Sequence, residues 1–147
     1  MKKVLAGLVL GSILLVNSAF ANTNDNVTEK VAAAFKQEFV QAKEVSWEKT
    51  DNSFRATFKL NDDVLTAYFS PDGELMGVVR NLLSTELPIN LQISLKRDYA
   101  NYWVTDLFEF ARKDASGYFI TLENADQRIT MKSGDGLSWS TYLRVKK

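Results

Sequence analysis

The chain has 147 residues, with 18 lysines and arginines balanced by 18 aspartates and glutamates, and it contains neither histidine nor cysteine. The absence of both residue types excludes Ser-His-Asp triads, thiol nucleophiles, disulfides and the common zinc sites. A net charge of zero also lacks the basic field that attracts nucleic acid or an anionic membrane.

The first 21 residues have the three regions of a secretory signal peptide. Lys2 and Lys3 form a positive start, residues 4–16 form an apolar run, and Ala19-Phe20-Ala21 forms an A-x-A cleavage site. The apolar run is shorter than the roughly 20 residues that span a bilayer. We expect cleavage after Ala21, with 16 basic and 18 acidic residues left and hence a net charge of −2. The mature protein is expected in a bacterial periplasm or secreted, without stable membrane insertion.

A helix is predicted near the start of the mature chain. Asn26 and Glu29, three residues apart, resemble a capping pair. The segment VTEKVAAAFKQEFVQA follows with apolar residues at helical spacing, among them Val31, Phe35 and Phe39. We interpret this stripe as part of a hydrophobic core.

After this helix the hydrophobic period changes from 3.6 to 2, which is typical of strands. The first expected strand begins with Val45 and Trp47. In the second, FRATFKL, the apolar residues alternate with Arg55, Thr57 and Lys59, which places the two sets on opposite faces.

The turn after the third expected strand is spelled twice. YFSPDGELM at 68–76 and MKSGDGLSW at 131–139 share a serine, an aspartate and a glycine 63 positions apart, taking residue 133 against residue 70. Aspartate bonds to nearby backbone amides and glycine accepts positive φ, so both suit tight turns. The spacing predicts an internal duplication. The strand phase stays open, since Phe69 suits one face, whereas Tyr68 and the matching Met131 suit the other.

The second half begins with another expected helix, LPINLQISLKRDY, with Pro88 in its first turn. Phe108 and Phe110 then begin the second expected sheet, and YFITLEN continues it with period 2. In the last strand, alternation predicts that the inward residues are Leu137, Trp139, Thr141, Leu143 and Val145.

Together these elements predict an α+β fold, made as a tandem repeat of one helix packed on a four-stranded antiparallel sheet. The first repeat covers about residues 26–82 and the second about 83–147 of a mature domain at 22–147. Trp47 and Trp139 are expected in the core because they occupy inward phases of their strands.

The sheet face that the helices leave uncovered is the expected functional surface. Alternation places on it a mostly polar set: Ser46, Glu48, Arg55, Thr57, Lys59, Glu109, Phe119, Thr121, Glu123, Arg128, Tyr142 and Arg144. We select Arg55, Phe119, Tyr142 and Arg144 as candidate partner-binding residues, because aromatic residues and arginine are enriched in interfaces. A solvated sheet surface without a binding role is the alternative.

The segment AAAFKQEFVQAKEVSWEKTDNSFRATFKLNDDVLTAYFSPDGEL resembles the first repeat of the PepSY-like proteins described as β-lactamase-inhibitor-like. The matching features are two phenylalanines on a helix, a V-x-W strand, aromatic strands and a final D-G turn. LPINLQISLKRDY and GYFITLEN extend the resemblance over nearly all of the mature chain. It implies a small exported protein of a type common in Bacteroidetes, with tandem helix-on-sheet repeats and a sheet face suited to binding protein. It transfers no target and no site residue.

We therefore expect a non-enzymatic periplasmic protein that binds or inhibits an unknown exported or envelope protein, without catalytic residues, metal or cofactor and without nucleic acid. The five aspartates that could form paired catalytic carboxylates all lie in expected turns, where that residue serves the backbone: Asp62, Asp63, Asp72, Asp126 and Asp135. Two alternatives remain. One is a carrier of a small apolar ligand or peptide between sheet and helices, and the other is an envelope stress or structural protein.

Overall fold

The computed structural model describes residues 26–147, so the predicted signal peptide and its cleavage site after Ala21 lie outside the described residues. In this part of the chain, each of two α-helices precedes four strands. Helix α1 (Glu29–Glu38) is followed by β1 (Lys43–Lys49), β2 (Phe54–Leu60), β3 (Asp63–Phe69) and β4 (Leu75–Asn81). A short 3-10 helix, η1 (Ser84–Glu86), leads to α2 (Ile89–Asp98), then β5 (Trp103–Ala111), β6 (Ser116–Glu123), β7 (Gln127–Ser133) and β8 (Ser140–Lys146). No helix within residues 26–147 is long and apolar enough to cross a membrane.

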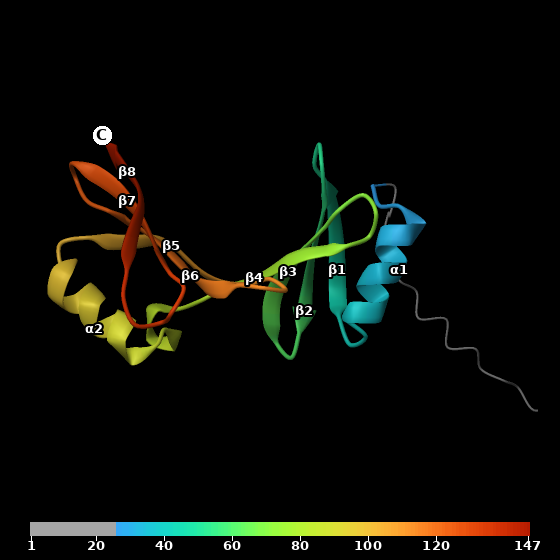
Figure 1. Ribbon diagram of the computed structural model, residues 1–147, viewed down its shortest axis with the longest axis horizontal. Coiled ribbons are helices and arrows are strands. Elements are labelled where there is room, and N and C mark those ends of the chain that lie inside the picture. The colour runs from blue at the N-terminus through green and yellow to red at the C-terminus, as the bar shows by residue number, and fades with distance from the viewer. Residues whose placement is uncertain (1–25) are drawn as a thin grey trace, which may run out of the picture.

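All eight strands form one antiparallel sheet in the order β1 to β8. The predicted tandem repeat of one helix on its own four-stranded sheet is therefore wrong. β4 pairs with β5 from Val78 opposite Ala111 to Asn81 opposite Phe108, which makes the sheet continuous. The physical reason is that two separate sheets would leave two edges with unpaired N–H and C=O groups, and this pairing satisfies both. Helices α1 and α2 lie at opposite ends of the molecule, with β4 and β5 between them (Figure 1).

The core beneath α1 is largely aromatic. Helix α1 begins after Thr28, whose hydroxyl accepts a hydrogen bond from the Val31 N–H at 3.3 Å, so Thr28 caps the helix instead of the expected Asn26. The Phe35 ring lies 5.0 Å from that of Phe58 and 5.3 Å from that of Trp47, centroid to centroid. Such edge-to-face pairs add to the stabilisation from buried area. Trp47 is partly buried against this cluster, as expected.

The core beneath α2 is aliphatic. Its buried members are Leu82, Leu87, Leu91, Leu107, Ile120, Leu122, Ile129 and Met131. Trp139 packs against this cluster from the segment before β8, and its Nε1–H donates to the Leu91 carbonyl at 3.3 Å. The two clusters are separate, so each helix stabilises its own half of one shared sheet.

The repeated sequence forms two similar turns. The Ser70 hydroxyl accepts a hydrogen bond from Glu74 N–H, and the Ser133 hydroxyl accepts one from Gly136 N–H, both at 3.1 Å. Gly73 has φ +82° and Gly136 has φ +70°, a region that favours glycine. A Cβ at Gly73 would lie 3.4 Å from the Lys30 carbonyl, and one at Gly136 would lie 3.3 Å from Pro88. Each turn therefore packs against the start of its own helix, and the internal duplication itself stays a prediction.

The structure settles the phase of the strand before each turn. Phe69 in β3 is fully buried, so its neighbour Tyr68 points to the opposite face. Met131 in β7 is also fully buried. Tyr68 and Met131 match in the sequence but lie on opposite faces, so the offset of 63 does not hold through the strands.

A bulge reverses the expected phase of β8. Thr130 pairs with Leu143, whereas the next residue, Met131, pairs with Thr141, so Tyr142 is an extra residue. Leu143 and Val145 were predicted to point inward, but they are 54% and 48% exposed. Leu137 and Thr141, also predicted inward, are exposed as well.

Candidate functional site

The two helices cover the same face of the sheet, and we call the opposite face the free face. Alternate residues of β2 and β3 are buried beneath α1, and alternate residues of β6 and β7 are buried beneath α2. The residues between them point away from the helices. In both halves threonines face one another there, with Thr57 and Thr66 hydroxyls 3.5 Å apart and Thr121 and Thr130 hydroxyls 3.2 Å apart.

The first half of the free face, on β1 to β3, has charges that neutralise one another. Arg55 forms an ion pair with Glu48, and Lys59 Nζ lies 2.8 Å from the Glu44 carboxylate. The hydrogen bond that Arg55 donates to Glu48 raises the pKa of Arg55 above its ordinary value. Since these side chains satisfy one another, this half presents a mixed, solvated surface.

The second half of the free face has four aromatic side chains in contact, which we call the aromatic patch. It consists of Phe108 and Phe110 on β5, Phe119 on β6 and Tyr142 on β8. The Phe119 ring stacks on Phe108 at 5.4 Å and meets Tyr142 edge to face at 5.4 Å, centroid to centroid. Tyr142 is 61% exposed and the three phenylalanines are partly exposed. A connected aromatic surface of this kind, on strands, is typical of binding sites.

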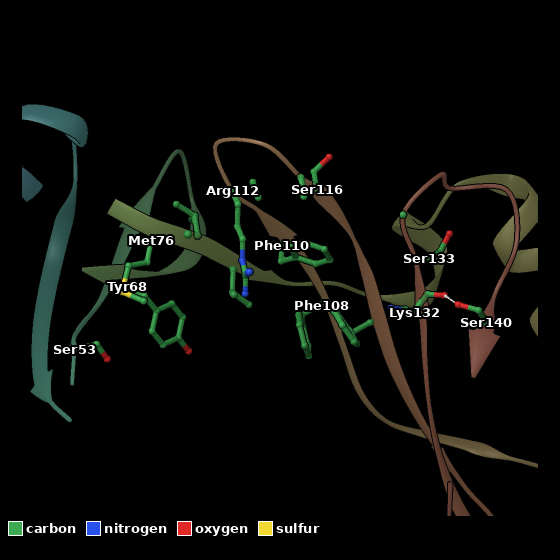
Figure 2. Close-up of a pocket in the computed structure, with 17 residues that line it drawn as sticks. Ser53, Tyr68, Met76, Phe108, Phe110, Arg112, Ser116, Lys132, Ser133 and Ser140 are labelled. Carbon is green, nitrogen blue, oxygen red and sulfur yellow. Dashed lines mark hydrogen bonds between the residues drawn. The ribbon is translucent and has the colours of Figure 1, made fainter. Parts of the chain in front are cut away.

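A groove of about 850 Å³ runs along the free face where the two halves meet, and the three phenylalanines of the aromatic patch form one side of it. Tyr68, Met76 and Val79 line it from the first half, and Phe108, Phe110 and Phe119 line it from the second. Figure 2 shows Tyr68 and Met76 on one side of the groove and Phe108 and Phe110 on the other. The groove therefore combines residues from β3 and β4 with residues from β5 and β6.

Among residues 26–147, two cations line the groove, Arg112 after β5 and Lys132 on β7, and no aspartate or glutamate does. The Arg112 side chain crosses Gly77, where a Cβ would lie only 3.3 Å from Arg112 Cγ. Lys132 Nζ lies 5.6 Å from the centre of the Tyr142 ring. Neither cation forms an ion pair with an acid within residues 26–147.

The structure brings together two of the four candidate partner-binding residues. Phe119 and Tyr142 are in contact in the aromatic patch. Arg55 lies on the free face of the first half, paired with Glu48. Arg144 lies opposite the buried Ile129, on the face that the helices cover, because the β8 bulge shifts its phase. Arg144 is thus separated from Phe119 by the thickness of the sheet.

Sequence reasoning missed half of the patch and both cations of the groove. Phe108 and Phe110 were expected to begin the sheet as Val45 and Trp47 do, but a bulge between Val104 and Asp106 places Leu107 in the core instead. Glu109, expected on the free face, pairs with Arg80 on the other face. The one available signal was the L-F-E-F pattern itself, which suits either phase.

The densest charge cluster lies between the two cores on the helix-covered face. Arg80 Nη2 donates to Glu109 at 3.0 Å, and Arg80 Nη1 lies 3.5 Å from Asp63 and 3.7 Å from Glu86. The hydrogen bond to Glu109 raises the pKa of Arg80. These groups join β3, β4, β5 and η1, so we interpret the cluster as structural. Within residues 26–147, no group of three or more acidic side chains is placed to hold a metal ion.

Comparisons with known proteins found likeness at the level of structure alone. Neither the protein-family models nor the curated proteins gave a match. A DUF2874 family protein from Bacteroides ovatus superposes with a TM-score of 0.71 at 18% identity, over 83% of this chain and 89% of that one. A BLIP-like protein from Bacteroides fragilis superposes with a TM-score of 0.70 at 14% identity, over 82% of this chain and 86% of that one.

A protein from Bacteroides eggerthii, described provisionally as periplasmic, superposes with a TM-score of 0.69 at 13% identity, over 82% of this chain and 88% of that one. At such identities the likeness shows the fold and transfers no site. The expected resemblance is confirmed in its β-lactamase-inhibitor-like part, while its PepSY-like part stays a prediction. The chain thus has the BLIP-like fold that is found in these Bacteroides proteins.

Proposed function

We propose that this chain is a non-enzymatic, exported protein that binds another exported or envelope protein through the free face of its sheet. The predicted signal peptide supports export, and so does the likeness to a protein described provisionally as periplasmic. The absence of histidine and cysteine from the chain supports a binding role over a catalytic one.

The aromatic patch is the observation on which this proposal rests. Phe119 contacts Phe108, Phe110 and Tyr142, whose ring centroids lie 5.4 to 5.5 Å from that of Phe119. A solvated sheet face would gain nothing from exposing a connected group of rings, whereas an interface gains rigid apolar area at low entropic cost. We therefore place the centre of the interface on Phe119 and Tyr142, with Arg55 at its edge.

A carrier of a small apolar ligand is the second candidate, and the groove favours it. Ligand pockets commonly enclose about 300 to 1,000 Å³, and the groove has about 850 Å³. The groove lies on the free face, however, and not between sheet and helices as a carrier was expected to need. Mass spectrometry of the native protein under gentle conditions would reveal a retained small molecule.

Capture from a periplasmic extract with matched variants tests the proposal. Wild-type protein and Ile93→Ala should retain the same dominant protein, because Ile93 is an exposed apolar residue on α2, away from the free face. Phe119→Ala and Tyr142→Ala should lose that protein while keeping their melting temperatures. Equal capture by all four proteins would place the interface elsewhere and contradict the proposal.

A further inference from the structure

Resting on the proposed function, we propose that the groove takes a segment of the partner protein that presents a carboxylate beside an apolar side chain. The apolar side chain would lie on Phe110 and Phe119, and the carboxylate would bind Arg112 and Lys132. These four residues line one groove.

The first argument is charge. The chain has six arginines, and Arg55, Arg80, Arg97 and Arg128 each form an ion pair with an acid. Arg112 and Arg144 form none within residues 26–147, and of the two only Arg112 lines the groove. Arg112 and Lys132 therefore give an apolar groove two positive charges, and no acidic residue of the described range lines it. Interfaces match charge in this way to select partners, so a partner with a carboxylate is favoured.

The second argument is the position of the Arg112 side chain. It crosses Gly77, and the Cβ of any other residue there would press on Arg112 Cγ at 3.3 Å and on the Ala111 carbonyl at 3.2 Å. In Figure 2 the side chain points between Tyr68 and Phe110. Packing of the aliphatic stem reduces the entropy that is lost when the guanidinium binds. The planar guanidinium can then bind a carboxylate through two hydrogen bonds.

The third argument separates a protein segment from a free fatty acid, whose chemistry is similar. The aromatic surface does not end at the groove but continues to Tyr142, which is 61% exposed and is not among the groove's lining residues. A single acyl chain in the groove would leave that ring in solvent. A protein segment covers both the groove and the adjoining ring, as standard-size interfaces do.

The experiment uses a displayed library of random linear peptides, selected on the mature chain. We expect enriched peptides to contain Asp or Glu within two positions of a Phe, Leu or Ile. The best binder is then synthesised with its acid and with the matching amide, and both are titrated against wild type, Arg112→Gln, Lys132→Gln and Arg144→Gln. Arg144→Gln is the matched control, since that arginine is also without an ion pair but lies opposite Ile129 on the other face.

The acid peptide should bind Arg112→Gln about tenfold more weakly than wild type, as expected for a lost charge-assisted hydrogen bond. Its affinity for Arg144→Gln should stay within about twofold of wild type. On wild type, the amide peptide should bind about tenfold more weakly than the acid peptide. On Arg112→Gln the two peptides should differ little in affinity, which would show that the peptide carboxylate and Arg112 interact directly.

Three outcomes would overturn the proposal. The first is no enrichment at all, the second is enrichment without acidic residues, and the third is equal loss of acid and amide peptides on Arg112→Gln. If no peptide is enriched and laurate binds wild type but binds Arg112→Gln more weakly, the groove takes a small amphiphile instead. Phe119→Ala distinguishes this failure from that of the proposed function. If the enriched peptides lack acidic residues and Phe119→Ala still abolishes their binding, the free face binds protein and only the carboxylate preference is wrong.

Discussion

The two halves of the sheet use aromatic side chains in opposite ways. Beneath α1 the rings are inside, where Phe35 contacts Phe58 and Trp47, and the free face above them has mutually paired charges. Beneath α2 the core is aliphatic, and rings cluster on the free face around Phe119. Aromatic composition alone therefore does not separate packing from recognition. The face on which a ring lies decides which of the two it serves.

The largest effect should come from breaking the aromatic core of the first half. Phe35 is 4% exposed and its ring contacts four others, so Phe35→Ala should destabilise the fold by about 3 to 5 kcal/mol. Chemical denaturation monitored by circular dichroism measures this. Binding by the free face should survive wherever the variant stays folded. An unfolding midpoint equal to that of wild type would mean that the rings do not stabilise this half.

A slightly smaller loss is expected from the single indole in the second core. Trp139→Ala removes a partly buried side chain and its hydrogen bond to the Leu91 carbonyl, and should cost about 3 kcal/mol. Trp139→Phe keeps most of the packing and loses the bond, so it should cost about 1 kcal/mol. Equal losses for the two variants would show that the hydrogen bond, and not burial, gives Trp139 its role.

On the free face the same kind of truncation should have the reverse pattern. Phe119→Ala should weaken partner binding by about 2 kcal/mol, as truncated interface anchors do. Because Phe119 is partly exposed, the same change should lower the free energy of unfolding by less than about 1 kcal/mol. Titration calorimetry with the captured partner and denaturation of the same sample compare the two directly. A large loss of stability would make Phe119 a packing residue like Phe35.

Substitution in the Arg80 charge cluster, which lies between the two halves, should have a smaller effect on stability. Arg80→Ala removes the contacts to Glu109, Asp63 and Glu86, and should cost about 1 kcal/mol, since these groups are partly exposed and screened by solvent. Hydrogen exchange of β4 and β5 amides should rise more than that of β2 or β7. An even rise across the sheet would show that the halves do not unfold separately.

Period and turn chemistry were sufficient to predict the order of the elements. Two helices, each followed by four strands, follow from the change of hydrophobic period and from the repeated Ser-x-Asp-Gly turns, which the structure places against the two helices. The pairing of β4 with β5 did not follow, because nothing in a linear pattern states which strand edges meet. Because this one pairing was missed, two separate four-stranded sheets were expected in place of one eight-stranded sheet.

Unbroken alternation was sufficient to place Phe119 on the free face. Phe119 lies in β6, whose period of 2 has no interruption, and its outward phase is as expected. Phe108 and Arg144 lie beyond bulges, at which one extra residue moves every later side chain to the other face. Arg112 and Lys132 enter the site through tertiary contacts across several strands, which sequence alternation does not encode.

The smallest expected effect concerns the charged end of the second half. Glu123 is 8% exposed and forms ion pairs with Lys147 at 2.8 Å and Arg128 at 2.6 Å. Its hydrogen bond from Lys147, and then that from Arg128, lowers the pKa of the Glu123 carboxyl below its ordinary value of 4.5. A carboxyl whose pKa is lower in the folded state stabilises the fold fully above its unfolded pKa, and this contribution is lost as the pH falls through the folded pKa.

Glu123→Gln should therefore have a lower melting temperature than wild type at neutral pH, and the difference between the two melting temperatures should narrow as the pH drops below 4.5. Melting curves of both proteins at matched pH values test this, with Glu38→Gln as the control for removing an exposed, unpaired carboxylate of residues 26–147. A gap between wild type and Glu123→Gln that stays constant into acid would mean that the ion pairs of Glu123 contribute nothing, and that the apolar contacts around it hold the ends of β6, β7 and β8 together.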